Sequence, residues 1–412
     1  RDSSTSRGLG DVYKRQFILR LINSEGEFRM IEQIKTALSA IFALVFGIYQ
    51  SVGFVPVPVK PVFTAQPAVF EAGDAYAVVW ATSVKGTGYL TYTYDGKEYT
   101  VYDAASGNIK TDDTVHVVKV KKEHLDHNTY QVHSQSVLFK FGYTAFKGAT
   151  VSSEAISFRG YSGQDEIEIV SVSDIHGETK KMKSAYAFLN ADHADLLVLN
   201  GDITNTSLSF KTQMVKDILG NAAYLSKGEY PVVYVRGNHE TRGEFAAHLR
   251  DYFPTDTNEL YFTFRYGPVS AVVIDSGEDK ADDHYEYSGL VDFESYRQQE
   301  FDWLKGLERD TSDGIQYRIA LSHDPNLADH FGENWSAELG RIGTQLLVSG
   351  HTHSLNLKEK SLTDPFSFLT FEDGGNGSDF IVSKILLKDG DARFYAVDHN
   401  GNVKMDRTLP LF

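Results

Sequence analysis

The sequence predicts an α/β fold with a two-sheet core flanked by helices, preceded by an all-β sandwich. The chain has 412 residues, which is enough for two domains and a sizeable core. Short runs of alternating apolar and polar residues fill 57–160, whereas beyond Gly160 apolar strands alternate with helical stretches. We therefore place an antiparallel sandwich over 57–160 and a layered α/β domain over 161–412.

Composition and charge limit the classes of function. The formal net charge of -16 argues against a nucleic-acid-binding surface, because phosphate backbones favour faces rich in Lys and Arg. Phosphate chemistry stays open, since bound divalent ions can dominate the charge inside one cleft. Cysteine is absent, which excludes disulfides, thiolate metal sites and a cysteine nucleophile.

The first 29 residues do not resemble a folded segment. Asp11–Gln16 matches the translated end of an adaptor used in sequencing libraries. We interpret 1–29 as an assembly artefact followed by a read-through leader, with Met30 as the true start. A natural disordered tail is the alternative.

Residues 30–56 have the pattern of an export signal. Lys35 precedes an uncharged stretch from Thr36 to Val59, whose apolar part has the length of a signal-peptide core. A cleaved signal peptide and an uncleaved membrane anchor both stay open, and a buried core helix is the alternative without export. We expect a secreted or extracytoplasmic protein, with membrane association through this segment as an option.

The region that follows reads as a linker and then a set of β-strands. Val55–Pro61 contains three prolines, which favour an extended backbone. Aromatic and β-branched residues alternate with polar ones in Ala75–Trp80, Gly88–Tyr94 and Lys97–Tyr102, and Asp95-Gly96 forms a turn between two of these runs. This pattern is typical of an antiparallel sandwich.

The second region has the order of an α/β domain. The predicted strands are 167–173, 195–199, 232–235, 271–274, 317–321 and 345–349, followed by 366–371, 380–387, 392–397 and 403–405. Helices are predicted at 179–189, 207–225 and 293–307. The later strands are expected to complete a second sheet.

Polar side chains follow most of these strands at the point where the strand ends. They are Asp174, His176, Asp202, Asn238, His239, His323, His351 and His353. Ligands of open α/β sheets bind at the carboxyl ends of strands, because the loops there converge on one crevice. An Asp and a His separated by one residue project to the same side of an extended segment. Oxygen and imidazole donors without thiolate suit Mn²⁺, Fe or Zn²⁺.

The five segments that carry these residues resemble the calcineurin-like metallophosphoesterase family. They are Ser173–Gly177, Gly201-Asp202, Gly237–Glu240, Ser322-His323 and Gly350–His353, and they occur in the order of the family. The resemblance covers about 166–353. The region upstream resembles the fibronectin-III-like domain of purple acid phosphatases, through Val79-Trp80 and the segment 116–132.

The resemblance implies a site for two metal ions. One ion would bind Asp174, His176 and His353, the other would bind Asn238, His323 and His351, and Asp202 would bridge them. Independently of the family, two ions about 3.5–4 Å apart can share a carboxylate, hold a bridging hydroxide as nucleophile and clamp both oxygens of an in-line displacement. The resemblance also places His239 beside the leaving oxygen as general acid. Glu240 is expected to orient a neighbour.

Two positions depart from the purple acid phosphatases. Asn205 stands where those enzymes have a tyrosine iron ligand, and Leu355 stands where they usually have a second tyrosine. We therefore expect a colourless enzyme. The insert 276–287 is either a lid or a solvated acidic loop, and Arg236 and Arg242 either bind phosphate or form structural ion pairs.

These observations predict an exported metal-dependent enzyme that hydrolyses a small phosphomonoester. A phosphodiesterase of the same family and a catalytically inactive surface binding protein are the alternatives. Nucleic acid is not expected as a partner, because the chain is acidic and has no basic stripe. The natural substrate, the metals, cleavage of the signal and the oligomeric state stay open.

Overall fold

The structure is a computed structural model, and it describes residues 29–45, 60–142, 144–326, 334–359, 368–375 and 378–411. The residues group into two compact units. One comprises 1–59 and 138–148, in which a helix spans 29–45. The other comprises 60–137 and 149–412 and holds both sheets described below.

The predicted export segment lies partly outside the described residues. The structure describes 30–45 of this segment but not 46–56, and of the predicted artefact and leader it describes only residue 29. Within the described ranges, no helix is long and apolar enough to cross a membrane. The artefact, the signal and the linker therefore stay predictions.

The first sheet of the larger unit has three parallel strands at its centre. They are β10 (Ile167–Val172), β11 (Leu196–Asn200) and β12 (Val232–Val235). Three antiparallel strands extend the sheet beyond β10, namely β19 (Ile381–Lys388), β20 (Asp391–Asp398) and β21 (Val403–Pro410). Strand β10 is buried along its whole length, which is expected of a strand with elements packed on both faces.

The second sheet has six strands in the order β13-β14-β15-β16-β18-β17. Their bounds are β13 (Phe262–Tyr266), β14 (Val269–Ile274), β15 (Tyr317–Ser322), β16 (Leu346–Ser349), β17 (Asn356–Lys358) and β18 (Leu369–Glu372). Buried side chains of both sheets form one hydrophobic cluster, which includes Ile169 of β10 and Ile319 of β15. The two sheets therefore pack face to face.

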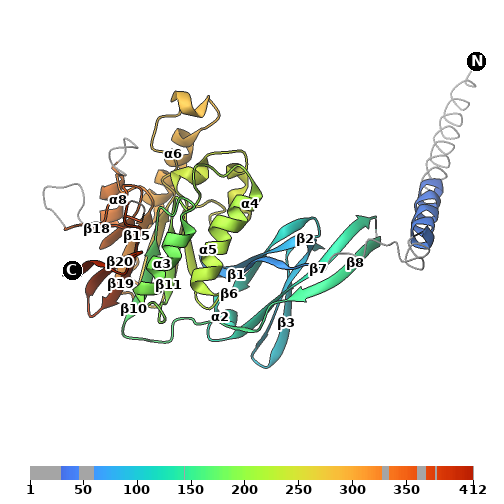
Figure 1. The fold of residues 1–412 in the computed structure, drawn as a ribbon, viewed down its shortest axis with the longest axis horizontal. Coiled ribbons are helices and arrows are strands. Elements are labelled where there is room, and N and C mark those ends of the chain that lie inside the picture. The colour runs from blue at the N-terminus through green and yellow to red at the C-terminus, as the bar shows by residue number, and fades with distance from the viewer. Residues whose placement is uncertain are drawn as a thin grey trace, which may run out of the picture. The chain divides into compact units, whose positions relative to one another are not determined.

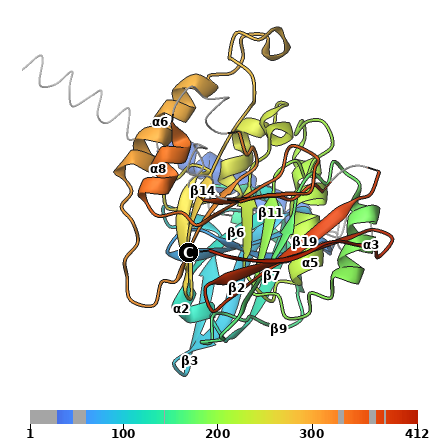
Figure 2. The same cartoon turned by 90° about the vertical axis from the view of Figure 1, so that its left-hand side faces the viewer.

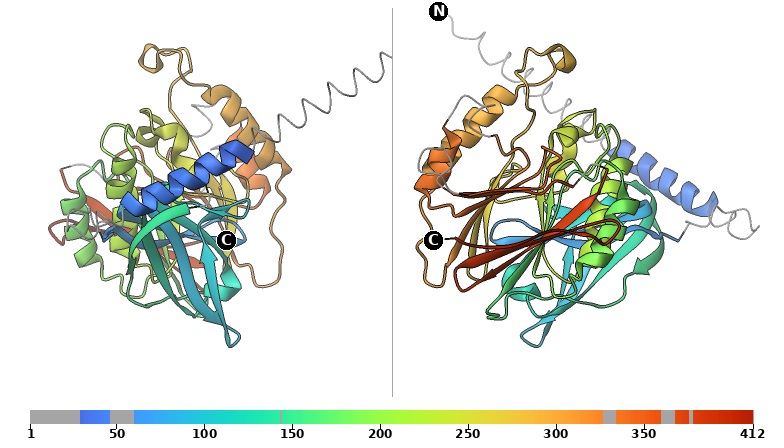
Figure 3. Two further views of the ribbon diagram at one scale, coloured as in Figure 1. Left: turned by 90° about the vertical axis from the view of Figure 1, so that its right-hand side faces the viewer. Right: turned by 60° about the vertical axis from the view of Figure 1, so that its left-hand side comes forward.

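Helices cover the outer faces of both sheets (Figures 1 and 3). Helix α3 (Thr179–Leu189) packs on the first sheet, together with a helical segment made of α4 (Lys211–Gln213), the π-helix η1 (Met214–Leu219) and α5 (Gly220–Ser226). Helices α6 (Phe293–Gly306) and α8 (Trp335–Arg341) pack on the second sheet. The predicted two-sheet core with flanking helices is confirmed. The expectation that the later strands complete the second sheet is wrong for three of them, because β19, β20 and β21 extend the first sheet and only β18 joins the second.

The strands predicted upstream are present, but they continue the first sheet. Their bounds are β1 (Phe63–Glu71), β2 (Ala75–Tyr94), β3 (Lys97–Tyr102), β4 (Ala104–Ala105), β5 (Asn108–Ile109), β6 (Asp113–Lys121), β7 (Thr129–Phe141), β8 (Thr144–Ser152) and β9 (Ile156–Ser157), with helix α2 (Lys122–Leu125) after β6. Strand β1 pairs with β12 in parallel, with Phe70 opposite Val232. A separate fibronectin-III-like sandwich over 57–160 is not shown.

The reason lies in the two faces of the upstream strands. One face carries Phe70, which belongs to the same buried cluster as Val170 and Leu197 of the α/β region. The other face carries Trp80, which is fully buried in a cluster of its own with Tyr130. Alternation along the strands predicts two faces, but it does not reveal that one of them covers the α/β core.

We predict that Phe70→Ala destabilises the α/β core itself. Phe70 is buried and contacts the ring of Phe253 at a centroid distance of 4.9 Å, so its loss leaves a cavity that costs about 3–5 kcal/mol. Phe210→Ala is the matched control, because Phe210 is 66% exposed and its loss should change stability by about 0.5 kcal/mol or less. Urea unfolding followed through Trp303 and Trp335 measures both. Unchanged α/β stability in Phe70→Ala would contradict a shared core.

Candidate metal centre

The loops after five strands meet at one end of the two sheets. Backbone hydrogen bonds join them directly. The amide of Asp174 donates to the carbonyl of Gly201 at 3.0 Å, and the amide of His176 donates to that of Asp202 at 2.9 Å. In the second sheet, Gly350 donates to the carbonyl of His323 at 2.8 Å. The predicted side chains therefore come from both sheets and converge.

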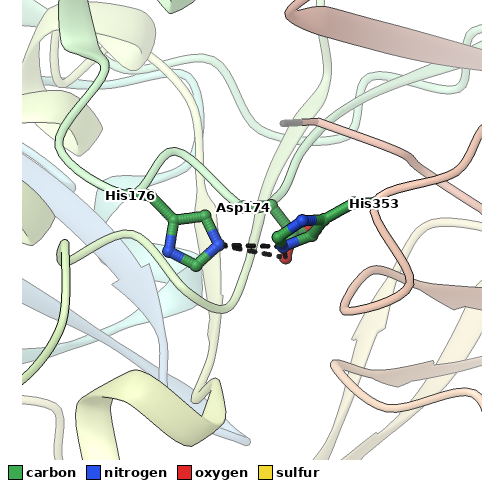
Figure 4. Close-up of side chains that lie close together, drawn as sticks. All are labelled: Asp174, His176 and His353. Carbon is green, nitrogen blue, oxygen red and sulfur yellow. Dashed lines mark hydrogen bonds and ion pairs between the residues drawn. The ribbon is translucent and has the colours of Figure 1, made fainter. Parts of the chain in front are cut away.

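Asp174, His176 and His353 form the first group (Figure 4). Nε2 of His176 lies 3.0 Å from Nε2 of His353, and these atoms lie 3.6 and 3.3 Å from Oδ1 of Asp174. Asp174 is completely buried, and its Oδ1 has no hydrogen-bond partner among the described residues. Two imidazole nitrogens and one carboxylate oxygen thus point at a common space.

Asp202, His323 and His351 form the second group. Nε2 of His323 lies 3.3 Å from Oδ2 of Asp202. The same Asp202 oxygen lies 3.7 Å from Nε2 of His176, which belongs to the first group. Asp202 therefore stands between the two groups, as a bridging carboxylate would.

Asn238 adds an amide to the second group. One terminal atom of this amide lies 3.1 Å from Oδ2 of Asp202 and 3.2 Å from Nδ1 of His351, and the other lies 2.9 Å from Nη2 of Arg242. With its nitrogen inward, the amide donates to the Asp202 carboxylate. With its oxygen inward, it faces other electron-pair donors, an arrangement that a cation between them would stabilise.

The backbone is left-handed at most of these residues. The φ angles are 50° at Asp174, 45° at His176, 52° at Asp202, 66° at His351 and 52° at His353. Non-glycine residues rarely adopt this conformation, and it clusters at functional sites. The prediction that the Asp-x-His segment is extended is wrong. Each pair reaches one site because the chain turns sharply at both residues.

Glu240 holds the loops around Asp202 in place. Its carboxylate is fully buried and accepts hydrogen bonds from the amides of Asp202, Thr204 and Gly237 at 2.9, 2.7 and 3.0 Å. It also accepts one from the Thr204 hydroxyl at 2.8 Å. Four donors on one carboxylate fix two loops together, which supports the expectation that Glu240 orients a neighbour.

His239 lies at the rim of the centre. Its backbone amide donates to Oδ1 of Asp202 at 2.9 Å, and its Nε2 lies 3.8 Å from Oδ2. Its Nδ1 contacts the carbonyl oxygen of Asn205. Burial lowers the pKa of His239, while the Asp202 carboxylate and the Asn205 carbonyl oppose that shift. His239 thus lies outside the first and second groups, although it forms a third possible ligand group with His176 and Asp202.

The electrostatics fit a cation. Burial alone would raise the pKa of Asp202, but His323 lowers it to about 2. Burial alone would lower the pKa of His323, but Asp202 and Asp174 raise it to about 10. A protonated His323 therefore balances the buried carboxylates when no metal ion is bound, and a metal ion would take over that role.

The two flanking arginines form ion pairs. Arg236 binds Asp275 through Nε at 2.9 Å and Nη2 at 2.8 Å. Arg242 pairs with Glu278, which is buried within the insert 276–287 and also accepts from the Tyr287 hydroxyl at 2.9 Å. The base of the insert is therefore anchored, and the rest projects from the top of the molecule in Figure 2.

Sequence reasoning missed three acidic residues around the centre. Glu278 pairs with Arg242, as described above. Glu372 accepts a hydrogen bond at 3.1 Å from the hydroxyl of Thr352, which lies between His351 and His353. Asp373 is fully buried and accepts from the Ser383 hydroxyl at 2.8 Å. The only sequence signal is that Glu372 and Asp373 follow an apolar strand.

We predict that Glu240→Gln weakens metal binding about 10- to 100-fold, because partners behind the ligands fix their orientation. The amide group of Gln turns one acceptor oxygen into a donor and faces backbone amides that also donate. Glu244→Gln is the matched control, since Glu244 is exposed and nearby. Titration with Mn²⁺ followed by calorimetry measures both. Equal affinities in the two variants would contradict this role of Glu240.

We also predict that metal binding releases protons. The pKa of His323 lies above neutral pH when no metal is bound, so a metal ion must displace that proton, and its affinity should fall as the pH falls. Calorimetry at pH 7 in two buffers with different ionisation enthalpies should show release of about one proton. His323→Gln should reduce this release, whereas His248→Gln, at an exposed position, should leave it unchanged. Some release should persist, because Asp174 and Asp202 also raise the pKa of His176 against the effect of burial. Binding without proton release would contradict the prediction.

Comparison with known proteins identifies a domain within the chain. The model of the calcineurin-like phosphoesterase family matches residues 167–355, which contain every predicted ligand. No curated protein matches the chain. Similar solved structures include a dimetal phosphatase from Danio rerio (13% identity, TM-score 0.41, 60% of this chain and 99% of that one). Another is the phosphoesterase Yfce from E. coli, with 15% identity and a TM-score of 0.30 over 60% of this chain and 100% of that one. A third is Vacuolar Protein Sorting 29 from Cryptosporidium parvum, with 12% identity and a TM-score of 0.32 over 60% of this chain and 100% of that one. From the family match over 167–355, the chain contains a calcineurin-like phosphoesterase domain and is a metal-dependent phosphoesterase.

Proposed function

We propose that the protein is a dinuclear metal-dependent phosphatase that hydrolyses a phosphomonoester. The observation that carries this proposal is the position of Asp202 between two groups of ligand atoms. Asp174, His176 and His353 would hold one ion, and Asn238, His323 and His351 would hold the other. Mn, Fe and Zn all suit these oxygen and imidazole donors.

Such ions, when bound, supply Lewis acidity and lower the pKa of water, so that solvent provides the nucleophile. The chain itself keeps the donors in position. Asp202 and Asp174 are buried by the surrounding loops, and Glu240 fixes the Asp202 loop through four hydrogen bonds. Little rearrangement is then needed when the phosphate ester arrives, which favours catalysis.

His239 is proposed as the general acid. The contact of its Nδ1 with the Asn205 carbonyl requires a proton on Nδ1, because a carbonyl oxygen only accepts. Nε2 is therefore the nitrogen that exchanges a proton with the substrate. Located at the rim, 3.8 Å from Asp202, it can protonate a departing alkoxide, which contributes typically about 10²–10⁴-fold.

Export stays part of the proposal. It rests on the uncharged stretch from Thr36 to Val59, of which the structure describes only the part up to 45. If the stretch is not cleaved, we propose that it associates the exported protein with the membrane. A small phosphate ester is the proposed partner, and the acidic composition speaks against nucleic acid.

The monoester proposal can be tested with aryl esters. We expect the Mn²⁺-loaded enzyme to hydrolyse an aryl phosphomonoester faster than the matching diester. His239→Ala should lower kcat for an alkyl phosphomonoester about 10²-fold and for p-nitrophenyl phosphate much less, because nitrophenolate leaves without a proton. Asp202→Ala should lose both activities together with metal.

Other outcomes decide between the alternatives. Faster cleavage of the diester would favour a phosphodiesterase. Two bound metals per chain without turnover of either ester would favour a binding protein. Equal losses for both leaving groups in His239→Ala would contradict the role of His239 as general acid.

A further inference from the structure

A pocket of 490 Å³ adjoins the metal centre at His176. Its other side chains are those of Glu178, Asn205, Thr212, Gln213, Lys216 and Asp217. All of them belong to the larger unit. Among the described residues that line this pocket, none has an aliphatic or aromatic hydrocarbon side chain. Pockets for small molecules are usually lined mostly by apolar groups, so this composition is informative.

The pocket lies on the His239 side of the centre. The Asn205 carbonyl contacts Nδ1 of His239 and lies 3.2 Å from Nδ1 of His176. Asn205 also faces Gly177, where an added Cβ would lie 3.5 Å from the Asn205 Cβ. If His239 protonates the leaving oxygen, the group attached to that oxygen extends towards this pocket. The inference therefore rests on the proposed function.

Asp217 is the group that most needs a ligand. It is 6% exposed, and its Oδ1 accepts no hydrogen bond from the part of the chain that the structure describes. The Lys216 ammonium lies 3.2 Å from that oxygen, but this is an ion pair between adjacent residues without hydrogen-bond geometry, and the Lys216 side chain is 79% exposed. A buried acceptor without a donor is costly unless a ligand or water supplies one.

The backbone explains how Asp217 reaches the pocket. Met214–Leu219 is a π-helix between α4 and α5, and such wider turns occur frequently at functional sites. Gln213 is already used within the fold, since its side-chain oxygen accepts from the amides of Ser209 and Phe210 at 2.8 Å each. Asp217 and the exposed residue Thr212 line the pocket without such a role.

We propose that this pocket binds the alcohol part of the substrate and that this part is a neutral polyhydroxylated group, such as a sugar or polyol. The carboxylates of Glu178 and Asp217 accept hydrogen bonds from hydroxyl groups, and Thr212 and Asn205 can both donate and accept. Glu178 also pairs with Lys181 at 3.6 Å, so an ammonium group matches each carboxylate and the pocket offers no excess of positive charge to a second anionic group. Its lining is mostly polar, so it offers little apolar surface to a hydrocarbon chain.

The test compares two substrates with similar leaving groups. Glucose 6-phosphate and n-hexyl phosphate are both esters of primary alcohols, so their intrinsic reactivities are close. The Mn²⁺-loaded full chain should show a kcat/KM at least about tenfold higher for glucose 6-phosphate. Asp217→Asn and Thr212→Val should each lower this ratio, and Asp217→Asn should lower it about tenfold, the effect of losing one hydrogen bond to a charged group.

Controls separate this inference from the proposed function. Asp251→Asn, at an exposed position, should leave the ratio unchanged. Hydrolysis of p-nitrophenyl phosphate reports the proposed function alone. Binding of glucose, observed by NMR of the ligand, does not need turnover and should weaken in Asp217→Asn. A preference for hexyl phosphate, an unchanged ratio in both pocket variants, or glucose binding that is absent or unaffected by Asp217→Asn would overturn the proposal.

Discussion

The site is organised around one buried carboxylate, that of Asp202. Its Oδ2 lies 3.3 Å from His323 and 3.7 Å from His176, so it touches both groups of ligand atoms. Its backbone amide is held by Glu240, and its Oδ1 accepts from the amide of His239. Displacement of Asp202 would therefore change the geometry of both ion sites and of the proposed acid at once.

Burial of so much charge would be unfavourable without compensation. Carboxylates in a low-dielectric interior require an opposite charge or hydrogen bonds, and both are present. Glu240 receives four hydrogen bonds, whereas Asp174 keeps one oxygen without a donor among the described residues. That oxygen faces two imidazoles. The same loops contain left-handed residues, whose strain a bound cation would help to offset.

Much of this arrangement could be predicted from the sequence. The strands before Asp202 and Asn238 are apolar runs and those before Asp174 and His323 are mostly apolar, and polar residues at the ends of neighbouring strands converge. The left-handed turns could not be predicted, because local sequence does not show how sharply a loop bends. The pairing of β1 with β12 could not either, since an apolar strand face does not identify its partner.

The central claim is that Asp202 is shared by two metal ions. The most direct measurement is anomalous X-ray diffraction from crystals of the full chain grown with Mn²⁺. We predict two peaks about 3.5–4 Å apart, one beside Asp174, His176 and His353 and the other beside Asn238, His323 and His351, both in contact with Asp202. A single peak, or an ion bound to His239 and separated from Asp202, would contradict the account.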